Sequence, residues 1–104
     1  DNIDVVLANE KVDLDALAFL YMLKTITDPK DYAYYKKVIS LASKLEDYET
    51  ALFYLEELLK QGYRNKKELY SLADTALLRI SPQFNALLEK YLKQSRYDRA
   101  VPDN

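Results

Sequence analysis

Residues 32–61 read YAYYKKVISLASKLEDYETALFYLEELLKQ, and this stretch decides the fold. Apolar residues recur in it three and four positions apart, first around Val38 and again, after Asp47, through Leu55 and Leu58. That spacing is typical of the buried face of an α-helix. The polar break at Asp47 predicts two helices joined by a tight turn, the second spanning about residues 48–61.

The same pattern recurs along the chain, from Val5 to Ile39 and from Ile39 to Ala73. Both steps cover the same number of residues, and we call this number the repeat spacing. A spacing of this length is typical of helical-hairpin repeats, each of which buries its apolar face against a neighbour. The sequence therefore predicts an all-α fold, a right-handed stack of about three antiparallel helix pairs at residues 1–28, 29–62 and 63–95, with the first repeat truncated and a polar tail at 96–104. The positions that superpose are Val5, Ile39 and Ala73; Ala8, Ala42 and Ala76; Ala18, Leu52 and Ala86; and Leu20, Tyr54 and Leu88.

Short polar residues at the repeat spacing predict where the second helix of each pair begins. Asp13, Asp47 and Ser81 follow one another at this spacing, and each has a side-chain oxygen that can accept a free amide of a first helical turn. Pro82 after Ser81 suits a first helical position, because its missing N–H would be unpaired there anyway. We expect the helix after Ser81 to end near Gln94.

The first helices of the pairs are less regular. Asp28 and Pro29 predict the start of one, and Asn65 predicts the cap of another that is shortened or broken near Asp74. Residues 2–10 have room for only part of a helix. The tail from Ser95 onwards is polar and is expected to fray.

Composition excludes several classes of function. The 104 residues contain no His and no Cys, which removes the commonest general base, thiolate metal ligands and disulfides. The net charge of −2 provides no global positive field for nucleic acid. The longest apolar run covers residues 16–23, far short of the roughly 20 residues that span a bilayer. We expect no enzymatic activity, cofactor or metal, and the compartment stays open.

Two segments resemble the tetratricopeptide repeat (TPR). They are Tyr34-Tyr35 with Val38, and the run from Leu45 to Leu52 that leads to Leu55 and Leu58. In that family an aromatic and an aliphatic residue on the first helix meet a small residue on the second, and Tyr35, Val38 and Ala51 match these positions. Ile39 departs from the family's preference for a small residue, and Ala73 restores it in the third copy. The resemblance implies a protein-interaction module.

By that resemblance, the first helix of each pair lines a concave face that binds a peptide. Lysines and hydroxyls there would suit a carboxylate or an acidic partner. The alternative is an ordinary solvated helix face. The family's clamp for terminal carboxylates is not expected, because only Lys67 matches its pattern. The residues placed on the face are Lys36, Lys37, Ser40, Lys44, Lys67, Tyr70 and Ser71.

A narrower resemblance connects the end of the chain with the closing repeat of bacterial TPR arrays. It implies that the chain is the C-terminal part of a longer protein. The alternative is an accessory or oligomerising domain of an exported bacterial hydrolase, which the full open reading frame would distinguish. The residues that resemble the closing repeat are Asp74, Leu77, Leu78, Arg79, Pro82, Phe84, Leu87 and Leu88.

Residues 14–26 form a helix that is apolar nearly all round. One hypothesis is that this helix packs against an upstream element absent from the sequence, and another is self-association through Phe19 and Met22. The alternative is that residues 2–10 and the loop around Thr27 cover the extra apolar face.

Overall fold

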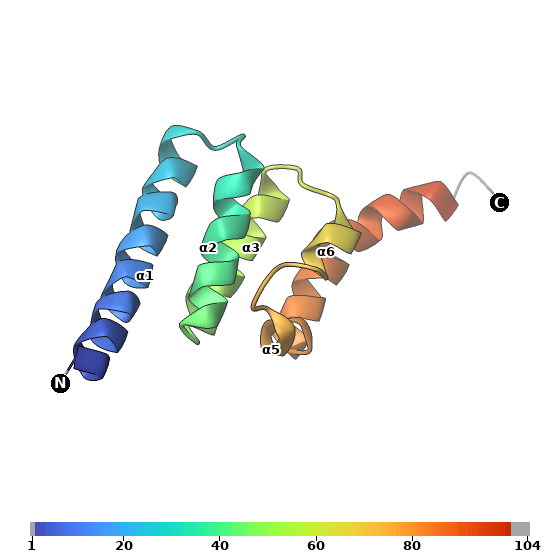
Figure 1. The fold of residues 1–104 in the computed structure, drawn as a ribbon. Helices are drawn as coiled ribbons and strands as arrows, with labels where there is room; N and C mark the ends of the chain where they lie inside the picture. Colours follow the sequence, from blue (N-terminus) through green and yellow to red (C-terminus); the bar gives the residue numbers. More distant parts are fainter. Residues whose placement is uncertain (1, 101–104) are drawn as a thin grey trace.

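The computed structural model describes the backbone of residues 2–100 and the side chains of residues 13–92. Every regular element in this part of the chain is an α-helix (Figure 1). The expectation of an all-α chain is therefore confirmed. The helices are α1 (Asn2–Thr27), α2 (Tyr32–Lys44), α3 (Tyr48–Lys60), α4 (Lys66–Leu69), α5 (Ala76–Arg79) and α6 (Pro82–Ala100).

Helix starts recur at the repeat spacing from α2 onwards. α2 and α4 begin at Tyr32 and Lys66, and α3 and α6 begin at Tyr48 and Pro82. The residue before each start supplies the cap. Side-chain oxygens accept first-turn amides of Ala33, Glu68, Thr50 and Phe84, and the residues that carry them are Asp31, Asn65, Asp47 and Ser81 respectively. The predicted caps Asp47 and Ser81 are thus confirmed.

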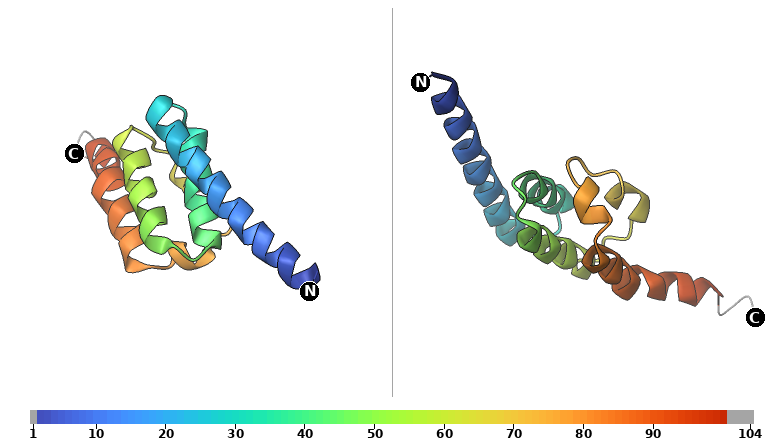
Figure 2. Two further views of the ribbon diagram at one scale, coloured as in Figure 1. Left: turned by 90° about the vertical axis from the view of Figure 1, so that its left-hand side faces the viewer. Right: turned by 90° about the horizontal axis from the view of Figure 1, so that it is seen from below.

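The helices lie side by side along an elongated molecule. Its principal extents are 67 × 30 × 18 Å, and its radius of gyration of 16.1 Å exceeds the roughly 13 Å of a globular chain of this length. α2 and the α4–α5 segment form one layer, and α3 and α6 form the other (Figure 2). α1 packs against α2 at one end of the row, and α6 lies at the opposite end.

The main apolar core lies between α2, α3 and the segment that follows them. Its buried members are Tyr35, Ile39, Ala42, Ala51, Leu55, Leu58, Leu59, Tyr63, Leu69, Leu78, Phe84, Leu88 and Leu92. Tyr48, Tyr54 and Tyr91 pack partly buried against it, as their spacing predicts. Among the described residues α1 contributes no buried side chain to this cluster. The core thus belongs to residues 32–92, and α1 is added to its edge.

The three residues that carry the resemblance to a hairpin repeat are all buried. Tyr35 is 4% exposed, and Val38 and Ala51 are fully inaccessible. Burial does not recur at every superposed position, however. Ile39 is buried whereas Ala73 is exposed, because the third copy lacks a continuous first helix. Asp74 adopts a left-handed φ of 62° between α4 and α5, so Ala73 lies in a turn. The prediction of a broken helix in this segment is confirmed.

The expected break in the first repeat is wrong. α1 runs without interruption from Asn2 to Thr27, so Asp13 lies inside the helix and caps nothing. Residues 2–27 contain neither Gly nor Pro, and an interior Asp costs a helix only a few tenths of a kcal/mol. Residues 2–10 continue the same rod and cannot fold back over residues 14–26, so that explanation of the apolar helix is also wrong.

Two further boundaries differ from expectation. α2 starts after Asp31 rather than at Asp28 and Pro29, because the Asp28 amide still closes α1 by donating to the Lys24 carbonyl. α6 continues past Gln94 to Ala100, because residues 83–101 contain no Gly or Pro to end it. Residues 101–104 of the predicted tail lie outside the described residues.

Candidate peptide-binding face on α2 and α4

α2 presents a basic stripe on the side away from the core. Lys37, Ser40 and Lys44 lie three and four residues apart, so they share one side of the helix. Both lysines are exposed and Ser40 is half-buried. α2 contains three lysines and no carboxylate. It is therefore strongly basic, although the chain as a whole has a charge of −2.

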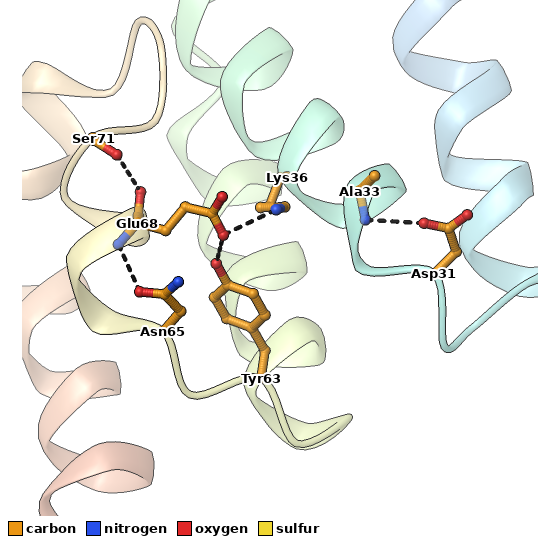
Figure 3. Close-up of polar contacts among 7 residues, drawn as sticks. All are labelled: Asp31, Ala33, Lys36, Tyr63, Asn65, Glu68 and Ser71. Carbon is orange, nitrogen blue, oxygen red and sulfur yellow. Dashed lines mark hydrogen bonds and ion pairs between the residues drawn. The ribbon is translucent and has the colours of Figure 1, made fainter.

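α4 is held beside α2 by a polar cluster at Glu68 (Figure 3). Lys36 Nζ on α2 lies 3.0 Å from Glu68 Oε1. The Tyr63 hydroxyl donates to the same oxygen. The Lys36 ammonium also lies 5.5 Å from the centroid of the Tyr63 ring, a cation–π contact. Glu68 itself is oriented by Asn65, whose side chain accepts from the Glu68 amide at 3.1 Å.

This cluster shifts the ionisation of both acidic partners. The hydrogen bond from Tyr63, followed by the one from Lys36, lowers the pKa of the Glu68 carboxyl below its ordinary value of 4.5. Burial raises the pKa of the Tyr63 hydroxyl, and the hydrogen bond to Glu68 raises it further. At neutral pH Glu68 is therefore ionised and Tyr63 protonated, and the charge of Lys36 is compensated within the molecule.

Ser40 is half-buried between Lys37 and Lys44 on α2, and the other predicted site residues separate into two groups. Lys36, Tyr70 and Ser71 make internal contacts. The Tyr70 hydroxyl donates to Asn85 Oδ1 at 3.4 Å, its ring packs edge-on against Phe84, and Ser71 Oγ donates to the Glu68 carbonyl at 2.9 Å.

Lys37, Lys44 and Lys67 form the second group. They are exposed, and the described residues offer them no ion-pair partner. Lys37 lies on α2 and Lys67 on α4, the two helices that the Lys36–Glu68 ion pair joins. We call Lys37, Lys44 and Lys67 the basic face.

Carboxylates gather on the other layer. α3 contains Glu49, Glu56 and Glu57 against the single Lys60. Glu56 accepts from the Tyr91 hydroxyl at 2.9 Å and lies 3.4 Å from Lys90 Nζ, which joins α3 to α6. α2 is therefore basic and α3 acidic.

Sequence analysis missed Tyr63 and Glu68 as part of this region. The usable signal was that Glu68 is the only carboxylate between Glu57 and Asp74, within a segment that carries Arg64, Lys66 and Lys67. A single carboxylate in a segment that carries several basic residues commonly forms an ion pair. Its partner could not be chosen without the arrangement of α2 and α4.

Other site types receive no support from the described residues. They contain no group of three or more Asp or Glu side chains that could hold a metal ion. None of the helices described is long and apolar enough for a membrane span. Comparison with protein-family models, with curated proteins and with solved structures finds no match to this chain.

Proposed function

We propose that this chain is a non-catalytic protein-interaction module of the TPR type, which binds an acidic peptide segment along α2 and α4. The repeat assignment is supported by helix starts and caps that recur at the repeat spacing, from α2 to α4 and from α3 to α6. The absence of His and Cys from the sequence supports a binding role over catalysis.

The observation that carries the ligand class is the free charge of the basic face. Glu68 compensates the charge of Lys36, whereas Lys37, Lys44 and Lys67 have no carboxylate to compensate them among the described residues. An ammonium group without an internal partner keeps its full attraction for an external carboxylate. Because these lysines are exposed, the attraction is screened over about 8 Å at physiological salt, and binding is weak and salt-sensitive.

Fluorescence anisotropy with a labelled, Glu-rich peptide tests this proposal. The double variant Lys37→Glu/Lys67→Glu should bind at least about tenfold more weakly than the native chain at low salt, because it reverses two of the three exposed cations of the basic face. The matched control is Lys60→Glu/Lys90→Glu, which changes the net charge equally but lies on the α3–α6 layer.

If the first variant loses affinity for the peptide and the control variant binds nearly as well as the native chain, the basic face is supported as the binding site. No binding by the native chain at low salt contradicts the ligand class. Equal weakening in both variants contradicts the location, because net charge alone would then account for the affinity. Circular dichroism of each variant checks that the helices are retained.

A further inference from the structure

The two sides of α1 differ in their surroundings. On the side that packs against α2, Ala18 and Thr25 are buried, and Tyr21 stacks near Tyr34 with ring centroids 6.1 Å apart. Met22 is half-buried, so only part of its surface is available to a partner. This inner side accounts for one apolar stripe of α1 and leaves the rest uncovered.

The opposite side of α1 is apolar and open to solvent. Its large side chains are Phe19 (59% exposed), Leu20 (57%), Leu23 (42%) and Ile26 (73%), and Ala16 extends the row by one turn. These residues, at positions 16, 19, 20, 23 and 26, are separated by steps of three and four along one side of the helix. Such a row of apolar residues is the seam along which two helices pack. We call these five residues the outer face of α1.

No other described element approaches this face. α1 is the end of the row, with α2 on its inner side and α6 at the far end of the molecule (Figures 1 and 2). A contiguous apolar patch of this kind on one helix is typical of an interaction surface. The occupant is indicated by the charges at its edge.

Asp13 and Lys24 lie on the same edge of the outer face, because eleven residues are close to three turns at 3.6 residues per turn. Both are exposed, and no ion pair joins either to another described residue. When two copies of one helix pack antiparallel, the same edge of each copy meets, with the order of residues reversed. Asp13 of one copy then lies toward Lys24 of the other, and this pairing occurs twice.

In a parallel arrangement the same edge of the two copies lies on opposite sides of the seam, so Asp13 and Lys24 of one copy face neither of these residues in the other. Opposite charges that face each other favour association, and these two residues provide such pairs in the antiparallel arrangement alone. The outer face is therefore complementary to itself in one orientation only.

We propose that the outer face of α1 is a self-association surface, on which a second copy of this chain packs its own α1 antiparallel. The two Asp13–Lys24 pairs fix the direction and place Phe19 and Leu20 at the middle of the seam, with Leu23 and Ile26 toward its ends. Met22, which the sequence suggested as a contact, lies toward the inner side. The surface is separate from the basic face, so it stands independently of the proposed peptide binding.

Sedimentation velocity of the full chain over a range from micromolar to near-millimolar concentration tests the proposal. The native chain should shift from monomer to dimer as concentration rises. Leu20→Lys should weaken the dimer by more than about tenfold, because it places a charge in the apolar seam of both copies. Leu20 is exposed in the monomer, so helix content should be unchanged. The matched control Phe53→Lys alters an equally exposed apolar residue on α3 and should leave the dimer intact.

Charge exchange tests the orientation. Lys24→Asp should weaken the dimer, and Asp13→Lys combined with Lys24→Asp should restore it, because the exchanged pair is again complementary in the antiparallel arrangement. A native chain that stays monomeric throughout assigns the outer face to a partner of another sequence and overturns the proposal. Association that survives Leu20→Lys, or that the exchange fails to restore, also overturns it.

Discussion

Lys36 on α2 and Glu68 on α4 form an ion pair, with Nζ and Oε1 3.0 Å apart, that joins two helices whose starts are one repeat spacing apart. The pair connects α2 with a helix of a single turn, which has little intrinsic stability of its own. Tyr63 completes the connection, because its hydroxyl donates to the same carboxylate oxygen.

A double-mutant cycle on Lys36→Met and Glu68→Gln should give a small favourable coupling free energy, because the side chains remain 24% and 42% exposed. Urea denaturation of the four proteins measures it. Lys60 and Glu57 provide a matched pair within one helix, where the coupling free energy should be smaller still, because the Lys60 side chain is 52% exposed. A coupling free energy of zero between Lys36 and Glu68 would show that their ion pair does not hold α4 beside α2.

Stability should fall in acid partly through Glu68. Its pKa is lowered in the folded state by Tyr63 and Lys36, so its contribution is present above the ordinary value of 4.5 and is lost as pH falls through the folded pKa. Glu68→Gln should therefore reduce the difference in unfolding free energy between about pH 7 and about pH 3. A pH dependence identical to that of the native chain would contradict a lowered pKa at this residue.

Tyr63 should have the opposite effect in alkali. Burial and Glu68 raise the pKa of its hydroxyl, so its contribution is complete below the ordinary value of 10.0 and is lost as pH rises toward the folded pKa. Tyr63→Phe should remove this alkaline loss, and the absorbance of tyrosinate during titration should lose one late-titrating group. Unchanged titration of the variant would rule out Tyr63 as that group.

Asp47 and Asp13 offer a paired test of the helix boundaries. Asp47 caps α3 through the Thr50 amide at 3.3 Å, so Asp47→Ala should cost about 1 kcal/mol of unfolding free energy. Asp13 lies exposed inside α1, so Asp13→Ala should change stability by no more than about 0.5 kcal/mol. Thermal denaturation below the concentration at which dimers form measures both. Equal losses would indicate that α1 is broken at Asp13.

Gly62 and Glu46 test two turns of opposite preference. Gly62 follows α3 with a φ of 106°, which L-residues rarely adopt, so Gly62→Ala should destabilise the chain by more than about 1 kcal/mol. Glu46 has a left-handed φ of 63°, where Gly carries no steric cost, so Glu46→Gly should be neutral or slightly stabilising. Denaturation midpoints compare the stability of the two variants. A Glu46→Gly variant less stable than Gly62→Ala would be inconsistent with these turn geometries.

Local signals in the sequence were sufficient for the central hairpin. Asp47 predicted the start of α3 correctly, and the spacing of Leu55 and Leu58 predicted its buried face. These signals act within one helix and need no knowledge of its neighbours. Asp31 was missed because Asp28-Pro29 offered an equally good local start, and only the length of α1 decides between them.

The candidate site was less predictable because it depends on contacts between helices. The sequence grouped Lys36 with Lys37, Lys44 and Lys67 because all four are lysines. In the structure Glu68 compensates the charge of Lys36 and makes no ion pair with the other three. Neighbouring lysines look alike in a sequence, and a turn of about 100° along the helix separates a paired cation from an exposed one. The outer face of α1 was visible as excess apolarity, but which residues it comprises required the position of α2.

Both proposed surfaces depend on the helices lying side by side, with α1 and α6 at opposite ends of the molecule. Nuclear Overhauser contacts measured on the Leu20→Lys variant, in which association is weakened, test this directly. We predict contacts between the rings of Tyr21 and Tyr34, and between Tyr70 and Phe84, but none between side chains of residues 13–27 and 82–92. Contacts between those two segments would indicate a closed helical bundle and would contradict the stacked arrangement.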